Sequence, residues 1–274
     1  MEQALEKSVV RVRDGVVTAV LDRVAVERPL QIRVRIGDDE RALSTTMRTP
    51  GDDVALAVGF LHAEGVLADG AALRGAEQVG DDTVRVDLAP DAAAALAASE
   101  RTFVTSAACG VCGRASLDGL EGGGGTLLHA DAGVAAAVIH RLPGALRAAQ
   151  ATFDSTGGLH AAALFSLDGA LIAVHEDVGR HNAVDKLVGR LLLAGQLPVS
   201  NGVLMLSGRA SFELVQKAEA AGIPIVAAVG APSSLAVERA AAAGMTLLGF
   251  VRDGGFNVYC GAARVAGLFE ANAA

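Results

Sequence analysis

The stretch of the chain that decides the fold is Gly202–Phe250, which reads GVLMLSGRASFELVQKAEAAGIPIVAAVGAPSSLAVERAAAAGMTLLGF. Short apolar runs at 203–206, 223–229 and 245–251 have the length and composition of buried strands. The segments between these runs have the spacing of amphipathic helices. Because strands that alternate with helices are joined by right-handed crossovers, this stretch predicts an α/β fold with a largely parallel sheet.

The two helices of this stretch carry start signals. Ser207 or Ser211 can cap the first helix, and Ser233 or Ser234 can cap the second. A glycine follows each helix and predicts its end.

The turns that follow the three strands should meet at the carboxyl edge of the sheet. They are Ser207-Gly208-Arg209, 230–234 and 252–255. Open α/β sheets bind ligands at this edge, and the free N–H groups of helix N-termini favour anions. We therefore expect a phosphate-bearing ligand there, with Ser207, Gly208 and Arg209 as candidate contacts.

The chain upstream predicts a smaller N-terminal α+β domain at 1–100 and a cysteine-bearing connection at 101–126. Residues 30–36 alternate between apolar and polar side chains, as a half-buried strand does, and 42–47 can form its hairpin partner. A helix should follow from residue 53, then a strand at 83–88 and an alanine-rich helix at 90–100. The α/β domain should occupy 127–274.

Composition excludes several classes of protein. The chain has 274 residues, of which 51% are hydrophobic, and no apolar run is long enough to span a bilayer. Its net charge of −8 disfavours general binding to nucleic acid. The acidic N-terminus lacks the features of a secretory signal, so we expect a cytoplasmic protein with no membrane or nucleic-acid partner.

The pair Cys109-Gly110-Val111-Cys112 is the sharpest chemical feature. In a reducing compartment, a close pair of thiols favours metal or redox chemistry over a structural disulfide. A structural zinc site would need four ligands, and no second pair exists, so we expect no metal. A thioredoxin-like dithiol is disfavoured because glycine-rich sequence follows the pair.

The run His175–Lys186, HEDVGRHNAVDK, concentrates ionisable side chains beside apolar sequence. Arg180 and His181 could recognise a ligand or take part in acid–base chemistry. The structural alternative is a capped helix start with internal salt bridges. His160, at the start of another expected strand, could line a site or could be structural.

Several motifs together resemble the formate dehydrogenase accessory sulfurtransferases, the FdhD family. They are Thr105 to Gly113, Thr156 to Ala161, Glu176 to Lys186, Ser207 to Phe250 and Phe256 to Tyr259. Their order along nearly the whole chain makes the resemblance specific.

The resemblance implies a C-terminal three-layer domain similar to cytidine deaminases and a homodimer. It implies a sulfurtransferase that takes persulfide sulfur from a cysteine desulfurase. The sulfur would pass to the molybdenum bis(molybdopterin guanine dinucleotide) cofactor of formate dehydrogenase, a bound substrate whose site a guanine nucleotide could also occupy. Cys109 matches the persulfide-bearing cysteine of the family and Cys112 its companion. The implied cofactor-binding residues form one segment: Phe256, Asn257, Val258, Tyr259, Cys260 and Gly261.

One position departs from the family pattern, and one functional alternative stays open. Gly230 stands where the family commonly has Ser, which removes a hydroxyl from that turn. The alternative function is a cofactor chaperone that hands over the molybdenum cofactor without sulfur chemistry of its own. Its cysteines would only aid docking.

Overall fold

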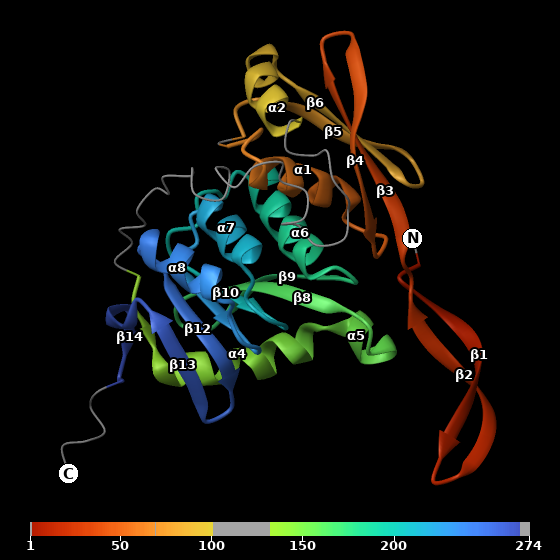
Figure 1. Ribbon diagram of the computed structural model, residues 1–274, viewed down its shortest axis with the longest axis vertical. Coiled ribbons are helices and arrows are strands. Elements are labelled where there is room, and N and C mark those ends of the chain that lie inside the picture. Colours follow the sequence, from red (N-terminus) through yellow and green to blue (C-terminus); the bar gives the residue numbers. More distant parts are fainter. Residues whose placement is uncertain (1, 69, 101–131, 269–274) are drawn as a thin grey trace.

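The computed structural model describes residues 2–68, 70–100 and 132–268 (Figure 1). Its first part contains the elements β1 (Ala4–Arg13), β2 (Val16–Ala25), β3 (Arg28–Ile36), β4 (Asp39–Arg48), α1 (Asp53–Ala63), β5 (Leu73–Gly80), β6 (Thr83–Leu88) and α2 (Ala93–Glu100). Its second part contains β7 (Val134–Ala135), α4 (Ala136–Ala149), α5 (Ala151–Thr156), β8 (His160–Phe165), β9 (Leu171–Asp177), α6 (Arg180–Leu193), β10 (Val203–Leu206), α7 (Phe212–Ala220), β11 (Ile225–Ala228), α8 (Ser234–Ala242), β12 (Thr246–Arg252), β13 (Gly255–Cys260) and β14 (Val265–Ala266).

The first part builds a four-stranded sheet in the order β4-β3-β6-β5. The predicted hairpin around Gly37 is confirmed, since β3 and β4 pair antiparallel from Arg28 with Arg48 to Ile36 with Asp39. Alternate side chains of β3 are buried in a core shared with α1 and α2. The predicted strand at 83–88 and both predicted helices of this part are also present.

The second part builds a six-stranded sheet in the order β13-β12-β11-β10-β8-β9. The strands β10, β11 and β12 are parallel, as predicted. The prediction that the sheet as a whole is largely parallel is wrong, because β8, β9 and β13 pair antiparallel with their neighbours. The connections from β8 to β9 and from β12 to β13 are tight turns, which can join only antiparallel neighbours.

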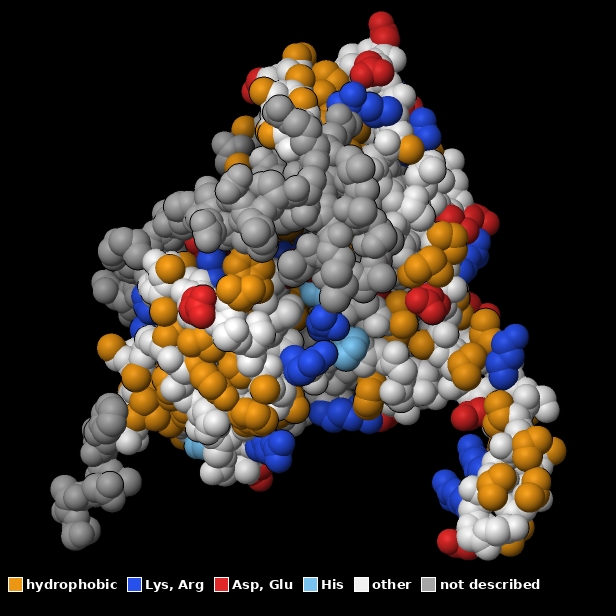
Figure 2. All heavy atoms as spheres, in the orientation of Figure 1, with side chains coloured by type: hydrophobic (Ala, Val, Ile, Leu, Met, Phe, Trp, Pro, Cys, Tyr) orange, Lys and Arg blue, Asp and Glu red, His pale blue; other side chains and the backbone are white. Residues whose placement is uncertain are grey.

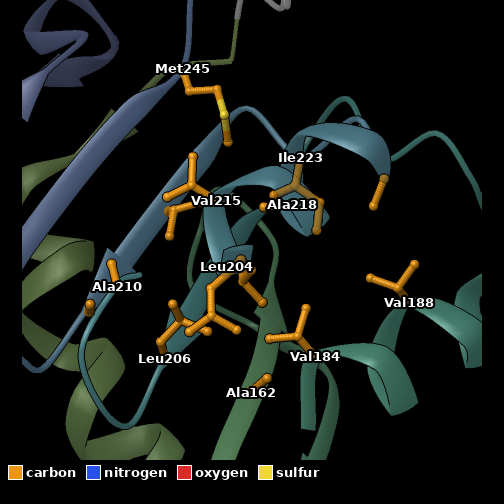
Figure 3. Packing of buried hydrophobic residues seen from close by; sticks show 14 of the residues in the cluster. Ala162, Val184, Val188, Leu204, Leu206, Ala210, Val215, Ala218, Ile223 and Met245 are labelled. Atoms are coloured by element: carbon orange, nitrogen blue, oxygen red, sulfur yellow. The ribbon is translucent and has the colours of Figure 1, made fainter. Parts of the chain in front are cut away.

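Helices cover both faces of this sheet (Figure 1), which explains why its central strands are apolar throughout. Leu204 and Leu206 of β10 lie in the cluster with α6, α7 and α8, whereas Val203 and Met205 lie in the cluster with α4. Figure 3 shows the first cluster, in which side chains from α6 and α7 meet those of β10. The molecule is thus a mixed α/β protein with several sheets. The likeness to cytidine deaminases and the domain boundaries stay predictions.

The hairpin of β1 and β2 extends away from both sheets (Figure 1) and was not predicted from the sequence. Its apolar side chains are mostly exposed: Val10 by 68%, Val12 by 63%, Val17 by 65% and Leu21 by 67%. The hydroxyl of Thr152 in α5 donates to Gln3 Oε1 over 2.9 Å at the base of the hairpin. The base of the hairpin therefore contacts the second part of the chain.

The helices α1 and α6 cross with their backbones in direct contact. A Cβ atom on Gly59 would lie 1.9 Å from the carbonyl oxygen of Asp185, and one on Gly189 would lie 1.9 Å from that of Ala55. Only glycine fits at either position. This crossing fixes the middle of α6 against α1 in the first part of the chain.

Candidate functional site at the carboxyl edge of the sheet

The turns after β10 and β11 and the neighbouring part of β12 form a row of backbone around Gly208, Gly230 and Gly249, which we call the glycine edge. The amide of Gly230 donates to the carbonyl oxygen of Gly208 over 2.9 Å, and the amide of Phe250 donates to that of Gly230 over 3.1 Å. These bonds continue the pairing of β10, β11 and β12 beyond the strands. The prediction that the turns meet at this edge is confirmed for those after β10 and β11. The third predicted turn, 252–255, closes the hairpin of β12 and β13 beyond Gly249.

The row leaves little space for side chains. A Cβ atom on Gly230 would lie 3.0 Å from Cγ of Arg209 and 3.1 Å from the carbonyl oxygen of Gly208. One on Gly249 would lie 2.9 Å from Cε2 of Tyr259. A serine at position 230 would therefore require Arg209 to move, which gives Gly230 a steric role in this chain.

The predicted contacts in the turn after β10 have different surroundings. Ser207 accepts a hydrogen bond from the amide of Ala161 over 2.8 Å, so its hydroxyl holds β8 against β10. Arg209 is exposed, and it forms no ion pair with a described residue. Of this turn, Arg209 and the backbone of Gly208 are the groups left open to a ligand.

His160 lies beside this turn. A Cβ atom on Gly208 would lie 3.4 Å from Nδ1 of His160, at the start of β8. Burial and the nearby charge of Arg180 lower the pKa of His160, while Asp177 acts in the opposite direction. The imidazole is therefore neutral at pH 7.

Arg180 and His181 form the first turn of α6, which begins at Arg180. Nε of Arg180 is buried and has no hydrogen-bond partner among the described residues. Burial lowers the pKa of His181 to about 4, with smaller contributions from Arg180, Lys217 and His160. Two neutral imidazoles and an arginine with an unsatisfied donor thus lie together near the glycine edge. Figure 2 shows basic and histidine side chains gathered near the middle of one face.

Glu213 of α7 is a neighbour of His181 that the sequence analysis missed. Its Oε2 lies 3.4 Å from Nε2 of His181, and its Oε1 lies 3.6 Å from Nζ of Lys217. Lys217 in turn binds both carboxylate oxygens of the buried Asp185, at 2.7 and 3.0 Å. The spacing of Glu213 and Lys217 in the sequence predicts only an ion pair along one helix, and this pair is present.

The rest of the run 175–186 joins the two parts of the chain. The fully buried carboxylate of Asp177 accepts from the amide of Thr49 over 3.1 Å and lies 2.8 Å from Nζ of Lys186. Lys186 also donates to the carbonyl oxygen of Thr49 over 2.8 Å. Asn182 donates to the carbonyl oxygen of Met47 over 2.8 Å. We call these residues the Asp177 network. Their geometry is that of the structural alternative, a helix start held by internal salt bridges and hydrogen bonds.

Glu176 and His175 make further contacts of this kind. The Glu176 carboxylate accepts from the amides of Thr152 and Phe153 at 2.9 and 2.8 Å, which caps α5. Nδ1 of His175 lies 3.2 Å from Oδ2 of Asp52. Of the whole run, only Arg180 and His181 contribute to the candidate site.

The segment 256–261 is divided along the edge strand β13. Asn257 and Tyr259 are exposed, and Asn257 pairs with Gly249 of the glycine edge. Phe256 and Val258 pack instead on the α4 face of the sheet. Cys260 and Gly261 lie near Met245 and Thr246, at the amino end of β12. The structure therefore brings Asn257 and Tyr259 to the edge, and not the remaining members of the segment.

The cysteine pair Cys109 and Cys112 lies outside the described residues. Cys260 is half-buried and donates to the carbonyl oxygen of Met245 over 3.4 Å. Burial raises the pKa of its thiol, which disfavours the reactive thiolate. Among the described residues, no helix is long and apolar enough to cross a membrane.

The arrangement suits an anionic ligand. Backbone amides, the N-terminus of α6, Arg180 and Arg209 lie near this edge, and each of these groups favours an anion. Neutral imidazoles can accept or donate hydrogen bonds there.

Comparisons with known proteins give a consistent result. Residues 25–266 match the model of the FdhD/NarQ family. The chain is 51% identical over 272 residues to the sulfur carrier protein FdhD of Streptomyces coelicolor, covering 95% of each chain. It is 46% identical over 252 residues to the protein of that name from Sulfolobus acidocaldarius, covering 91% of this chain and 93% of the other. A crystal structure described as a formate dehydrogenase accessory protein from Desulfotalea psychrophila superposes with a TM-score of 0.77 at 26% identity, covering 96% of this chain and all of the other.

Proposed function

Because the chain belongs to the FdhD/NarQ family, we propose that it is a sulfur carrier in the maturation of formate dehydrogenase. In this proposal it is a cytoplasmic homodimer that takes sulfur from a cysteine desulfurase. It delivers the sulfur to molybdenum bis(molybdopterin guanine dinucleotide), which it binds as a substrate.

The sulfur transfer rests on the cysteine pair. The thiolate of Cys109 attacks the terminal sulfur of the persulfide on the desulfurase. A new sulfur–sulfur bond forms on Cys109, and the cysteine of the desulfurase leaves as a thiolate. Cys112, at the spacing of a companion thiol, accepts or releases the sulfur in the later step.

The observation that carries the binding half of the proposal is the buried Nε of Arg180 near the glycine edge, which has no hydrogen-bond partner among the described residues. A buried donor without a partner is costly, and a phosphate oxygen would satisfy it. Arg209 and the amides of the turns supply further contacts to a diphosphate. The exposed ring of Tyr259 at the end of the row offers a surface for a planar base.

Mass spectrometry of the protein incubated with L-cysteine and its desulfurase tests the sulfur half. We expect one added sulfur atom on the peptide that contains Cys109, and its loss in Cys109→Ala. The peptide that contains Cys260 serves as an internal control and should stay unmodified, because that thiol is half-buried with a raised pKa.

Complementation of cells that lack the native protein tests the alternative. If Cys109→Ala and Cys112→Ala both restored full formate dehydrogenase activity, the sulfur-carrier proposal would be wrong. The chaperone function would then account for the family relationship. Loss of activity in Cys109→Ala, with the protein still folded and still able to bind a guanine dinucleotide, would support sulfur transfer.

A further inference from the structure

His181 is held between groups of opposite charge. Its Nε2 lies 3.4 Å from Oε2 of Glu213 and 3.4 Å from the hydroxyl of Ser211, both at the start of α7. Its Nδ1 makes no hydrogen bond to a described residue. One nitrogen is therefore directed to α7, and the other is left for a further partner.

More of the groups around His181 oppose a positive charge on its ring than favour one. The charged and titratable groups that act on it come from every neighbouring element: Arg180 of α6, Glu213 and Lys217 of α7, and His160 of β8. Only Glu213 favours the protonated ring, whereas burial and the three other groups oppose it. Oε2 of Glu213 is buried and makes no hydrogen bond within the described part of the chain.

Two unsatisfied groups of opposite charge thus flank the ring. Within the described part of the chain, Oε2 of Glu213 has no hydrogen-bond donor and Nε of Arg180 has no acceptor. An anion bound to Arg180 would offset the cations that oppose protonation of the ring. A proton on His181 would then supply one N–H group to Glu213 and one to the anion.

We propose that binding of a diphosphate-bridged dinucleotide at the glycine edge is coupled to uptake of a proton by His181, and that Glu213 positions and holds the resulting imidazolium. This inference rests on the proposed binding function and specifies the charge state of the site. The proton comes from solvent and no covalent bond changes. Because the complex carries one proton more than the free protein, affinity falls as the pH rises, by up to about tenfold per pH unit.

Isothermal titration calorimetry with di(guanosine-5′) diphosphate measures this coupling. Each phosphate of this dinucleotide has one ester and one anhydride linkage and keeps a single, strongly acidic oxygen, so the probe does not itself titrate near neutral pH. Titrations at pH 6.5 in two buffers with different heats of ionisation give the number of protons taken up. We expect net uptake by the wild-type protein and a weaker affinity at pH 7.5 than at pH 6.5.

Three variants identify the group that takes up the proton. His181→Gln should still bind the dinucleotide but lose most of the uptake and of the pH dependence. Glu213→Gln should reduce both, because the neutral amide no longer stabilises the imidazolium. His140→Gln is the matched control, since His140 lies on α4 against Phe256 on the other face of the sheet, and it should behave as the wild type.

The outcomes separate this inference from the proposed function. Binding by the wild type without proton uptake would overturn the inference and leave the binding function in place. Equal uptake in His181→Gln and in the wild type would also overturn it. No binding by the folded wild-type protein at millimolar dinucleotide would overturn both. The wild-type measurement alone remains decisive if a variant fails to fold.

Discussion

The start of α6 has two sides that treat charge in opposite ways. On the side toward α1 and β4, Asp177 and Lys186 are fully paired and buried. On the side toward the glycine edge, Arg180 has a buried nitrogen without a partner among the described residues, and His181 is held neutral by burial. Both sets of residues come from one short run of sequence. At the start of α6, the paired groups hold the two parts of the chain together, whereas the nitrogen of Arg180 without a described partner is one that a ligand could satisfy.

The substitution Asp177→Asn should break the satisfied side most severely. The carboxylate accepts from the amides of Thr49 and Gly179 and from Asn182, and it neutralises Lys186. An amide group would place its own donors against these donors and leave a buried ammonium unpaired. We expect a loss of about 3–5 kcal/mol in the free energy of unfolding, measured with urea.

Asp154→Asn is the control for this substitution. Its side chain is 74% exposed and pairs with Arg147 on the surface, so its removal should cost about 0–1 kcal/mol. A loss in Asp177→Asn as small as in this control would show that the Asp177 network does not stabilise the joint.

The substitution Gly59→Ala tests the backbone crossing of α1 with α6, with the next largest effect. The added methyl group would lie 1.9 Å from the carbonyl oxygen of Asp185, so the helices must separate. We expect destabilisation near or above the upper end of the about 1–3 kcal/mol that overpacking costs. Thermal and urea unfolding measure it.

Gly144→Ala makes the same chemical change in the helix α4, where the new Cβ atom meets no other atom within 4 Å. There it should stabilise the protein by about 0.5–1 kcal/mol, because alanine favours the helix. If both substitutions changed the free energy of unfolding in the same direction, the close crossing of α1 and α6 would not be what requires glycine at position 59.

The pH dependence of stability tests the side of α6 that faces the glycine edge. The pKa of His181 is about 4 in the folded protein, against about 6.5 in an unfolded chain. The unfolded chain therefore binds a proton first as the pH falls, and stability is lost progressively between about pH 6.5 and pH 4. At pH 5 the titration of His181 has lowered the free energy of unfolding by about 2 kcal/mol.

His181→Gln should remove that contribution, so its free energy of unfolding should fall less between pH 7 and pH 5 than that of the wild type. Urea unfolding at the two pH values measures the difference. An unchanged pH dependence would mean that the ring is not buried as a neutral group.

Much of the local structure could be predicted from the sequence. The parallel strands β10, β11 and β12 were predicted because runs buried on both faces are continuously apolar. The turns after β10 and β11, which build the glycine edge, followed from that order. The sheet was wrongly predicted to be largely parallel, since an apolar run alone does not specify the direction of its neighbour, and β8, β9 and β13 are antiparallel.

Other features depend on contacts between distant residues. The hairpin of β1 and β2 was missed because its apolar side chains are exposed, so its alternation does not mark a buried face. Lys186 finds its partner Thr49 at a separation of 137 residues. His181 was identified as a candidate, but Glu213 could not be, because a helical pair with Lys217 already explained its charge.

The crossing of α1 with α6 also limits how this protein can be recombined. A chimera that took its N-terminal part from one relative and its C-terminal part from another would inherit α1 and α6 from different parents. The α6 of one parent would need a glycine at position 189 to pack against Gly59 of the other. Its Lys186 would also need to reach the carbonyl oxygen of Thr49 from the other parent. Successful exchanges should therefore carry α1, β4 and α6 together, so the smallest transferable unit of this fold is a set of segments that is discontinuous in sequence.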